Sequence, residues 1–411
     1  MKIAYLSNRF PSLVEPYVEA QIQELRGRGV EIVACSILQP EGQFDGAQAD
    51  FYLSPLRFDV VLAATWIFVC RCPNWFPLVR RAFSSRRESV GRRFRTLLQS
   101  WLGVYLAACL RTQGIQHIHV HHGYFAAWVA MVCARILGIG YSLTLHGSDL
   151  LVDDNFLDIK LAHCAFCSTI SEFNERHIQR QYPEIPREKI VVHRMGVDCD
   201  TTPLMLAAHL PQRYFLLAVG RLNAVKNYPF LIRACRELKD RGMDIACSIA
   251  GDGPERAKLE SLIRDLDLEG EVKLLGSIPH SQLTPLYERA DLVVLTSKSE
   301  GIPLVLMEAM AYGLLVLAPR ITGIPELVSD GETGFLYQPG STDDFVSKVQ
   351  EIRRGSTNMG KIRVAARRRV QEQFDRRKNT AGFCDALLQH VGNRQELKNE
   401  DSLLQQVQLP V

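Results

Sequence analysis

EGIPLVLME, residues 300–308, is the stretch of sequence around which the rest of the chain is organised. A short apolar run at residues 291–296 precedes it and predicts a buried parallel strand. Pro303 stands where a helix would begin, and Gly313 stands where it would end. The order is therefore a strand, a loop that carries the first glutamate, and a helix that carries the second.

The two glutamates suit different parts of one anionic ligand. The amino end of a helix offers free N–H groups and the positive end of its dipole to a phosphate. Glu308 lies about five residues into the predicted helix, roughly 7–8 Å from that end. This is about the span from a diphosphate to its ribose hydroxyls, which a carboxylate can accept in pairs. Glu300 is left to face the other side of the diphosphate. The alternative is an ordinary strand–helix unit with two surface glutamates.

The composition is typical of a globular protein of two domains. The chain has 411 residues, of which 47% are hydrophobic and 23% are charged. Its net charge of +3 is too small to imply binding of nucleic acid. The eleven cysteines are scattered, and the first residues, MKIAYL, read as a strand rather than a signal peptide. We therefore expect free thiols and a cytoplasmic location.

Three patterns of metal-ligand residues occur, and we expect none of them to hold a metal. The C-x-x-C of residues 164–167 has no partner pair. His117, His119 and His121 alternate and share one face of a strand, which makes a poor tetrahedral cage. The D-x-D of residues 198–200 falls at a domain edge and is a tripeptide that arises often by chance.

The region from residue 57 to residue 112 combines arginines with aromatic residues. Its longest apolar run, residues 60–70, is too short to span a bilayer, which needs roughly 20 residues. Arginines interleaved with aromatics favour a surface that lies on anionic lipid. A solvated helical face and a site for single-stranded nucleic acid are the alternatives. The arginines, opposed only by Glu88 from residue 71 to 101, are Arg71, Arg80, Arg81, Arg86, Arg87, Arg92, Arg93 and Arg95.

The chain reads as two successive halves of alternating strands and helices. Strands expected at residues 3–6 and 30–37 flank a helix, which indicates a parallel sheet. The first loop, residues 8–12, has no glycine-rich fingerprint, which argues against a nicotinamide-binding domain. After a linker at residues 201–213, the alternation restarts. We therefore expect an α/β protein of two doubly wound halves with a cleft between them.

Four elements of the second half form one pattern. GRL at residues 220–222, followed by Lys226, places two cations on a strand-to-helix loop, and GDGP at 251–254 supplies a loop for close approach. The glutamate pair of residues 300–308 and GIPE at 323–326 complete the set. Together they strongly resemble the retaining GT-B glycosyltransferases of the large nucleotide-sugar-dependent family, glycosyl transferases group 1, family 4.

The resemblance extends from Lys2 to about His390, and the E-x7-E stretch is its most specific part. The first loop departs from the pattern because it lacks the paired glycines of many members. The usual phenylalanine after residue 198 is also absent, and TTP stands there instead. Landmarks of the first half are FP at 10–11, EPY at 15–17, LHGSD at 145–149, ISE at 170–172 and GVD at 196–198.

The resemblance implies a GT-B fold, in which two Rossmann-like doubly wound domains face a cleft. We expect an acceptor-binding domain at residues 1–205 and a donor-binding domain at residues 206–375. A helix at residues 376–392 would cross back to the first domain. Residues 393–411 are polar, and we expect this tail to be frayed.

The resemblance also assigns roles to particular residues. Arg221 and Lys226 would hold the pyrophosphate of the donor, Glu300 would face its sugar, and Glu308 would hold its ribose. His146 would lie by the sugar and the reacting centre. The candidate catalytic residues are His146, Arg221, Lys226 and Glu300. The candidate nucleotide-sugar-binding residues are Gly220, Arg221, Lys226, Gly251, Gly253, Glu300, Gly301, Ile302, Pro303, Leu304 and Glu308.

The chemistry of such a transfer agrees with these roles. Breaking a glycosyl–phosphate bond builds negative charge on the leaving diphosphate, which fixed cations and helix N–H groups stabilise. We therefore expect no cofactor and no requirement for a metal. The resemblance implies retention of anomeric configuration by front-face displacement, so Glu300 and Glu308 are not the acid and base of a glycosidase.

The expected function is transfer of a sugar from a nucleotide-diphosphate donor to a growing saccharide. The resemblance favours a lipid-linked acceptor at the cytoplasmic face of the membrane, in exopolysaccharide, capsule or lipopolysaccharide biosynthesis. One alternative is transfer to a small soluble acceptor, such as a sugar phosphate or an inositol phosphate. A nucleotide-sugar epimerase of the same fold would instead turn over the donor without an acceptor. A non-catalytic sugar-nucleotide binder is a third class.

Overall fold

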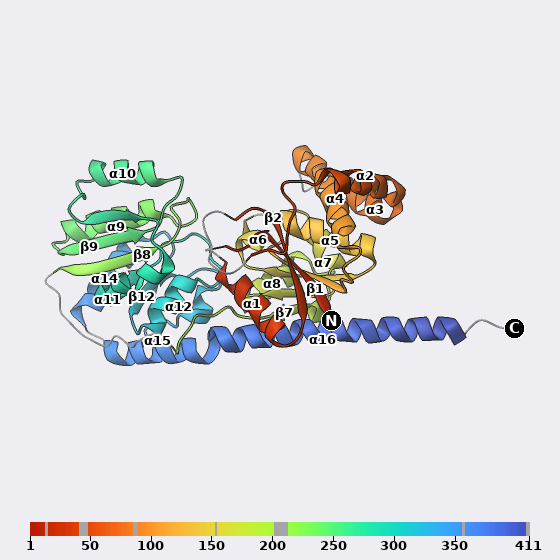
Figure 1. The fold of residues 1–411 in the computed structure, drawn as a ribbon. Coiled ribbons are helices and arrows are strands. Elements are labelled where there is room, and N and C mark those ends of the chain that lie inside the picture. The colour runs from red at the N-terminus through yellow and green to blue at the C-terminus, as the bar shows by residue number, and fades with distance from the viewer. Residues whose placement is uncertain are drawn as a thin grey trace. The chain divides into compact units, whose positions relative to one another are not determined.

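The computed structural model describes residues 1–12, 15–40, 48–84, 89–152, 154–200, 213–355 and 358–407, with side chains up to residue 392. The chain forms two units (Figure 1). Unit 1 comprises Met1–Ile170, Asn174–His193 and Thr380–Val411, and unit 2 comprises Ser171–Phe173 and Arg194–Asn379. Most of the predicted linker lies outside the described residues.

Unit 2 begins before the boundary expected at residue 205. Val197 forms a parallel bridge with Asp375, and the carboxylate of Asp198 lies 3.1 Å from the guanidinium of Arg376. These contacts attach the segment after His193 to the second unit.

The sheet of unit 1 has seven parallel strands in the order β3-β2-β1-β4-β5-β6-β7. The chain moves outward from β1 to β3 and then returns to β4 on the other side of β1, which is the doubly wound arrangement. The strands are β1 (Lys2–Arg9), β2 (Glu31–Leu38), β3 (Phe51–Tyr52), β4 (His117–His121), β5 (Gly140–Leu145), β6 (Cys167–Thr169) and β7 (Ile190–Val192).

Both faces of this sheet are covered, as the apolar runs of its strands predict. Ala4 and Leu6 of β1 belong to one core cluster, and Ile3 and Tyr5 belong to another. The covering helices include α1 (Pro16–Gly27), α5 (Phe125–Leu137), α6 (Ser148–Leu151), α7 (Leu157–His163), α8 (Glu172–Gln181) and the 3-10 turn η1 (Arg187–Lys189).

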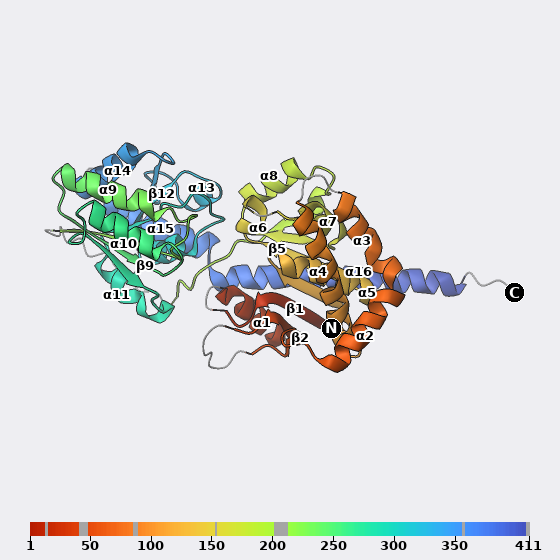
Figure 2. The ribbon, with the colours of Figure 1, turned by 90° about the horizontal axis from the view of Figure 1, so that it is seen from above.

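Three helices of unit 1 form a further layer beyond α5, which we call the outer helical layer (Figure 1). α4 packs on α5, and Gly103 permits a close approach because a Cβ there would lie 2.7 Å from Cβ of Val132. α2 and α3 pack on α4 (Figure 2). Its members are α2 (Phe58–Cys70), α3 (Cys72–Ser84) and α4 (Val90–Leu110).

The C-terminal helix α16 (Arg376–Val407) begins in unit 2, and its residues from Thr380 onward belong to unit 1. Phe383, Cys384, Leu387 and Val391 pack with β1 and α1 in one core cluster. The expectation of a frayed tail from residue 393 was wrong for the backbone, which stays helical to Val407. The polar sequence there is compatible with a helix because Gln, Glu, Lys and Leu are good helix formers.

The sheet of unit 2 has six parallel strands in the order β10-β9-β8-β11-β12-β13. Leu216 and Ala218 of β8 point to one core cluster and Leu217 to the other, so both faces are buried. The strands are β8 (Tyr214–Val219), β9 (Ile245–Ala250), β10 (Val272–Gly276), β11 (Leu292–Val294), β12 (Leu315–Pro319) and β13 (Phe335–Tyr337). The helices are α9 (Tyr228–Asp240), α10 (Arg256–Asp265), α11 (Thr284–Arg289), α12 (Leu304–Ala311), α13 (Ile324–Leu327), α14 (Thr342–Arg354) and α15 (Met359–Gln373), with a 3-10 turn η2 (His280–Gln282).

Candidate active site

The candidate donor site lies where the strand order of unit 2 reverses. β8 and β11 are neighbours in the sheet, but the chain leaves them in opposite directions. The loops at the carboxyl ends of such a strand pair form the crevice in which open α/β sheets bind ligands. Here these loops are residues 220–227, after β8, and residues 295–303, after β11. They carry both predicted cations and the first predicted glutamate.

Lys226 and Glu300 join these two loops directly. The ammonium of Lys226 lies 2.7 Å from a carboxylate oxygen of Glu300, and both side chains are largely buried. The hydroxyl of Thr296 also donates to the carbonyl of Lys226 at 2.9 Å, and the amide of Lys298 donates to the carbonyl of Val225 at 2.8 Å. The sequence predicted these two charges for different parts of the donor, and the structure shows that they meet.

The loop that carries Glu300 is supported from the side by the loop after β12. The hydroxyl of Thr322 donates to the carbonyl of Glu300 at 2.5 Å. A Cβ on Gly323 would lie 2.3 Å from the carbonyl oxygen of Gly301, so the two loops touch through their backbones. This contact fixes residues 300–302 immediately before α12, which begins at Leu304 after the N-cap Pro303.

Glu308 is the fifth residue of α12, as the sequence predicts, and both of its carboxylate oxygens have partners. The hydroxyl of Tyr287 donates to one oxygen at 2.7 Å, and the imidazole of His280 lies 2.9 Å from the other. The hydrogen bond to Glu308 raises the pKa of His280, whose side chain is 79% exposed. A carboxylate has about four lone-pair sites, so two remain for a diol.

Tyr287 and His280 were not found from the sequence. Both precede β11 in the chain, on α11 and η2, and reach Glu308 only through the packing of these elements against α12. Tyr287 is buried, and burial together with the charge of Glu308 raises its pKa well above the ordinary value. It therefore stays a hydrogen-bond donor and fixes the carboxylate.

The predicted glycines hold two loops together. Gly251 has φ +154°, and a Cβ on it would lie 2.0 Å from the carbonyl oxygen of Gly220. A Cβ on Gly253 would lie 2.4 Å from the carbonyl oxygen of Leu222. Glycine is thus needed at both positions because the loops after β8 and β9 are in contact there. A direct contact of these glycines with a donor stays a prediction.

Arg221 is exposed beside this loop contact. In the part of the chain that the structure describes, its guanidinium forms no ion pair. The two predicted cations therefore differ: the side chain of Arg221 is open to solvent, and that of Lys226 is held by Glu300. Arginine can bind a phosphate in a bidentate manner, which suits the exposed member of the pair.

The candidate catalytic residue His146 lies at the carboxyl end of β5 in unit 1. The amides of His146 and Gly147 donate to the carboxylate of Asp149 at 3.0 and 2.8 Å, and the amide of Gly123 donates to it at 2.9 Å. Asp149 is completely buried. This one carboxylate therefore fixes the turn that carries His146 against the loop that follows β4.

A ring of aromatic and titratable side chains surrounds His146. The centroid of its ring lies 4.7 Å from that of Tyr17, 4.4 Å from that of His122 and 5.3 Å from that of His121. Burial first, and then the charge of His122, lower the pKa of His146 well below its ordinary value. The His146 ring is therefore neutral at neutral pH.

The tautomer of His146 follows from a short hydrogen-bond chain. Nε2 of His121 donates to the side-chain oxygen of Gln21 at 3.0 Å, since that oxygen has no proton to give. Nδ1 of His121 then accepts from Nε2 of His146 at 3.0 Å. Nδ1 of His146 is left with the lone pair, so it is the nitrogen that can accept a hydrogen bond from a hydroxyl.

His122 carries the positive charge of this cluster. Its Nε2 lies 2.8 Å from a carboxylate oxygen of Glu15, and its Nδ1 lies 3.5 Å from Asp149, an ion-pair distance without hydrogen-bond geometry. Burial opposes the charge, but the interactions with Asp149 and Glu15 raise the pKa of His122 to about 10. Burial also opposes ionisation of Asp149, yet His122 and the surrounding amides lower the pKa of that carboxyl.

The sequence missed this cluster although it contained the signals for it. Glu15 and Tyr17 follow β1, His121 and His122 end β4, and His146 follows β5. These strands are neighbours in the order β1-β4-β5, so their carboxyl ends meet. The alternating histidines do share a strand face, but His117 and His119 bind the hydroxyl of Ser142 at 2.9 and 2.8 Å.

The two aspartates of the D-x-D pattern are ion-paired, and the two cysteines of the C-x-x-C pattern are buried. Asp200 is ion-paired with Arg377 at 3.3 Å, as Asp198 is with Arg376. Cys164 and Cys167 are free and buried, and burial raises the pKa of both thiols. Among the described residues, no group of three or more His, Cys, Asp or Glu side chains could hold a metal ion.

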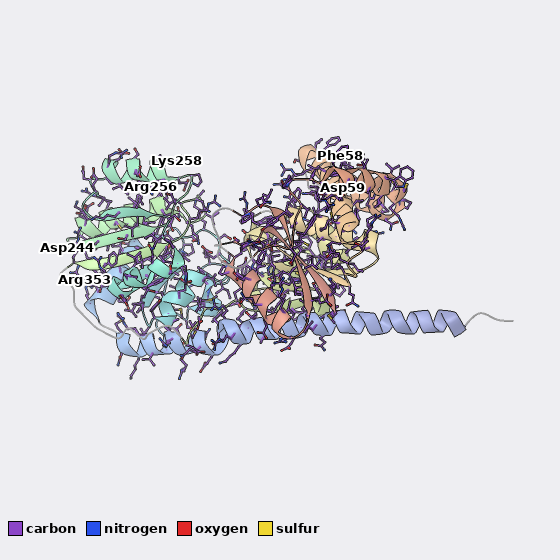
Figure 3. The ribbon with its side chains drawn as sticks, in the orientation of Figure 1. Phe58, Asp59, Asp244, Arg256, Lys258 and Arg353 are labelled. Carbon is purple, nitrogen blue, oxygen red and sulfur yellow. The ribbon has the colours of Figure 1, made fainter. Side chains whose placement is uncertain are left out.

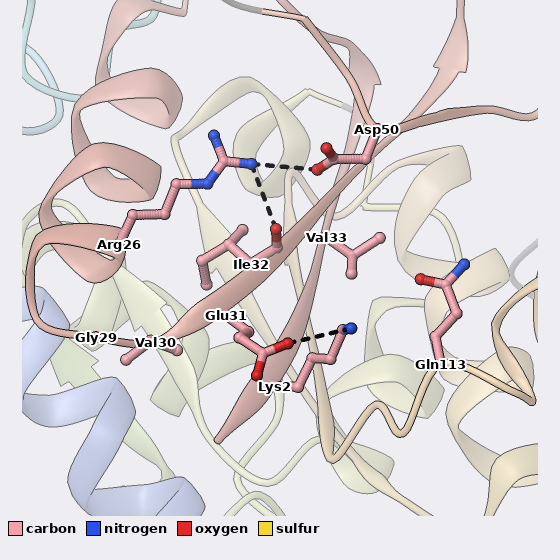
Figure 4. Close-up of a pocket in the computed structure, with 9 residues that line it drawn as sticks. All are labelled: Lys2, Arg26, Gly29, Val30, Glu31, Ile32, Val33, Asp50 and Gln113. Atoms are coloured by element: carbon pink, nitrogen blue, oxygen red, sulfur yellow. Dashed lines mark hydrogen bonds and ion pairs between the residues drawn. The ribbon is translucent and has the colours of Figure 1, made fainter.

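A pocket of about 560 Å³ lies at the opposite end of the strands of unit 1 (Figure 4). Lys2 and Glu31, at the amino ends of β1 and β2, form an ion pair there at 3.2 Å. Arg26 is likewise held by Asp50 at 3.2 Å. The charged side chains of this pocket are therefore already paired. The pocket also lies at the amino ends of the strands, whereas open α/β sheets bind ligands at the carboxyl ends.

Two units built on parallel sheets, the second with Lys226 and Glu300 in loops at the carboxyl ends of its strands, match the architecture expected of a GT-B glycosyltransferase. The family comparisons agree. Residues 14–201 match the family model of Glycosyltransferase Family 4, and residues 208–369 match that of Glycosyl transferases group 1. The chain belongs to the group 1 glycosyltransferases and has the α/β GT-B fold, which confirms the fold class and the family expected from the sequence.

Individual relatives cover almost the whole chain. The amylovoran biosynthesis glycosyltransferase AmsK of Erwinia amylovora is 28% identical over an alignment of 396 positions, which covers 91% of this chain and 96% of that protein. The structure of HepE from Anabaena in complex with UDP has a TM-score of 0.67 at 17% identity, covering 94% of this chain and 99% of HepE. That of the lipopolysaccharide outer core galactosyltransferase WaaB has a TM-score of 0.68 at 17% identity, covering 95% and 99%.

Proposed function

We propose that this glycosyltransferase moves a sugar from a nucleotide-diphosphate donor to a saccharide acceptor in the biosynthesis of a surface polysaccharide. The observation that carries the proposal is the contact between Lys226 and Glu300 across the two loops at the switch point of unit 2, with Glu308 inside the adjoining helix. The name of the relative AmsK, which acts in amylovoran biosynthesis, and the UDP in the structure of HepE support the two substrate classes.

The proposed binding of the donor uses groups that the structure places close together. Its diphosphate would bind Lys226, Arg221 and the free amides at the start of α12. A phosphate near Lys226 competes with Glu300 for the ammonium, and this frees the carboxylate for hydroxyls of the sugar. Glu308, fixed by Tyr287, would accept the two ribose hydroxyls.

The proposed reaction retains the anomeric configuration. The bond between C1 of the sugar and the phosphate oxygen breaks, and a bond from the acceptor oxygen to C1 forms on the same face. The proton of the acceptor hydroxyl passes to an oxygen of the leaving diphosphate. Lys226 and Arg221 stabilise the charge that grows on the diphosphate, so the chemistry proposed here has no step that needs a metal. Neutral His146, with its lone pair on Nδ1, would accept a hydrogen bond from a hydroxyl of the transferred sugar.

We further propose that the acceptor is lipid-linked and that the enzyme acts as a peripheral protein at the cytoplasmic face of the membrane. In the described ranges, no helix is both long and apolar enough to cross a bilayer. Attachment would therefore have to use a surface of the fold.

The test is a transfer assay with a panel of nucleotide-diphosphate sugars. Purified protein is incubated with each donor and with lipid extract from a polysaccharide-producing cell, and release of nucleotide diphosphate is measured. We expect release with one donor only when the lipid extract is present, and a product whose new linkage keeps the anomeric configuration by NMR. Release that is independent of any acceptor would indicate an epimerase or hydrolase instead, and an inverted linkage would contradict the proposed displacement.

A further inference from the structure

Exposed large apolar side chains are concentrated in and next to the outer helical layer. Nine of the fourteen exposed large hydrophobic side chains of the described residues lie between Leu56 and Leu98. Single exposed apolar residues are ordinary, but a group of this size marks an interaction site. The nine are Leu56, Phe58, Leu62, Trp66, Val69, Phe76, Val90, Phe94 and Leu98, and we call them the apolar face.

Four of them form a stripe along α2. Phe58, Leu62, Trp66 and Val69 follow the spacing of one helix face and are between 60% and 78% exposed. The opposite side of α2 holds Ala64, which is completely buried. Phe58 lies on the outer side of the layer (Figure 3). The helix therefore buries one apolar side and presents a second one to the outside.

A second stripe runs along the neighbouring helix α4. Val90, Phe94 and Leu98 are each spaced by four residues and are more than half exposed. The indole N–H of Trp101, one turn beyond Leu98, donates to the hydroxyl of Thr65 on α2 at 3.3 Å. Leu62 in turn lies one turn before Thr65. The two stripes therefore meet at this contact and form one continuous surface.

Exposed arginines lie in the same helical layer as the apolar face. Among the described residues of the layer, from Arg57 to Leu110, the one acidic side chain is Asp59, and it is ion-paired with Arg57 at 2.7 Å. Arg81 reaches Asp158 of α7 at 3.7 Å. The exposed arginines are Arg57, Arg71, Arg80, Arg81, Arg92 and Arg95. The outer helical layer thus exposes both apolar stripes and an excess of positive charge.

This combination decides between three occupants. Nucleic acid would use aromatic side chains for stacking, but Leu62, Val69 and Leu98 have no π-face to offer a base. A second copy of the chain in a two-fold contact would bring arginines of like charge together, which costs affinity. An anionic bilayer satisfies both features, because apolar side chains enter the acyl boundary while arginines bind headgroup phosphates.

We propose that the apolar face and its arginines are a docking surface for an anionic lipid bilayer. The stripes of α2 and α4 insert at the boundary between headgroups and acyl chains, and the arginines bind phosphates of the headgroups. The purpose of this docking rests on the proposed transfer to a lipid-linked acceptor, but the docking itself does not involve the donor site.

The test is sedimentation of the purified full chain with two kinds of vesicles, pure phosphatidylcholine and phosphatidylcholine mixed with phosphatidylglycerol. We expect binding to the anionic vesicles and little to the neutral ones. The triple variant Phe58→Ser, Leu62→Ser, Trp66→Ser should lose about tenfold or more in affinity. The matched control Val152→Ser, Leu275→Ser, Val364→Ser replaces exposed apolar residues elsewhere and should bind as the wild type does.

A second pair of variants tests the charges. Arg71→Ser with Arg80→Ser should weaken binding by about fivefold for each arginine at low salt. Arg233→Ser with Arg264→Ser removes two exposed arginines of unit 2 and should have no effect. Thermal stabilisation of each variant by nucleotide diphosphate should equal that of the wild type, which separates a failure of docking from a failure of the donor site.

Three results would overturn the proposal. One is wild-type protein that does not sediment with anionic vesicles. Another is a wild-type dimer, by light scattering, that the triple apolar variant converts to a monomer, since the face would then join two copies. The third is binding of a single-stranded oligonucleotide that the arginine variant loses while its sedimentation with vesicles stays unchanged.

Discussion

At the scale of single residues, the contact between Lys226 and Glu300 is the most informative feature of unit 2. A lysine and a glutamate that are both largely buried form one ion pair at 2.7 Å. The contact with Glu300 holds the ammonium of Lys226 at a fixed place. A fixed cation stabilises a developing diphosphate charge better than a mobile one, because its orientation costs nothing during the reaction.

Replacing Lys226 by alanine should lower kcat by on the order of 100-fold or more, because the developing charge on the diphosphate loses a fixed cation. The measurement is nucleotide release under saturating donor. Lys258→Ala removes an exposed lysine on α10 (Figure 3) and should leave kcat unchanged. Near-normal turnover in Lys226→Ala would refute the assigned role.

In unit 1, His122 should make stability depend on pH. The folded-state pKa of about 10 exceeds the ordinary value of 6.5, so this stabilisation is fully present below pH 6.5. It is lost as the pH rises through about 10, and it amounts to on the order of 5 kcal/mol. His122→Gln should therefore lose most stability relative to the wild type below pH 6.5, and the difference should shrink toward pH 10.

All four tryptophans, at residues 66, 75, 101 and 128, belong to unit 1, so urea unfolding followed by tryptophan emission reports this unit alone. A difference between His122→Gln and the wild type that stays constant from pH 6 to pH 10 would show that His122 is not the charged member of the cluster.

The spatial relation of Glu300, Pro303 and Glu308 was predictable from the sequence and the cluster around His146 was not, for a physical reason. Glu300, Pro303 and Glu308 lie on consecutive elements, so spacing along the chain fixes their relation in space. His122 and Glu15 are brought to His146 by the order of β1, β4 and β5, and a single sequence gives the strands but not their order.

At the scale of elements, the loops after β8, β9 and β12 are packed by backbone contacts that tolerate no side chain. Gly251→Ala would place a Cβ 2.0 Å from the carbonyl oxygen of Gly220 at a φ of +154°. We expect a loss of about 2 kcal/mol or more in the unfolding free energy of unit 2, together with weaker donor binding, because the loop with Arg221 must move.

The matched control is Gly270→Ala, in the turn before β10, where an added Cβ meets no atom within 4 Å. Backbone circular dichroism during urea unfolding compares the two variants. Equal stability of Gly251→Ala and Gly270→Ala would contradict the close approach of the loops.

For the outer helical layer, the sequence predicted a surface but not which side chains it exposes. The mixture of arginines and aromatics in residues 57–112 favoured a membrane surface, with a solvated face as the alternative. Periodicity identifies two sides of a helix such as α2, but it does not say which side the rest of the protein covers. The structure shows that α2 packs on α4 with its other side, so that Phe58, Leu62 and Trp66 are exposed.

At the scale of the whole molecule, each unit has its own core and its own group of functional side chains. The helix α16 is shared by both, because it begins in unit 2 and its later residues complete the core cluster of β1 and α1. The repeated strand–helix alternation made the fold class predictable. The length of α16 was not, because a polar sequence contains no apolar stripe to mark where the helix ends.

Truncation of α16 should show which part of this helix the core of unit 1 needs. A chain that ends after Asn379 loses Phe383, Cys384, Leu387 and Val391, which exposes Ile3 and Tyr5, and we expect unit 1 to unfold. A chain that ends after Gly392 keeps all four and should retain the tryptophan emission and urea midpoint of the full chain. Folded unit 1 in the shorter truncation would show that α16 is dispensable for its core.

The central claim is that unit 2 binds a nucleotide-diphosphate sugar through Lys226, Glu300 and Glu308, and thermal unfolding with a panel of nucleotide diphosphates and their sugars tests it most directly. At a hundred times its dissociation constant, the cognate ligand should stabilise the wild type by about 2.7 kcal/mol. Lys226→Ala and Glu308→Gln should each weaken that binding by about tenfold or more. No stabilisation of the wild type by any nucleotide diphosphate or nucleotide sugar would contradict the account.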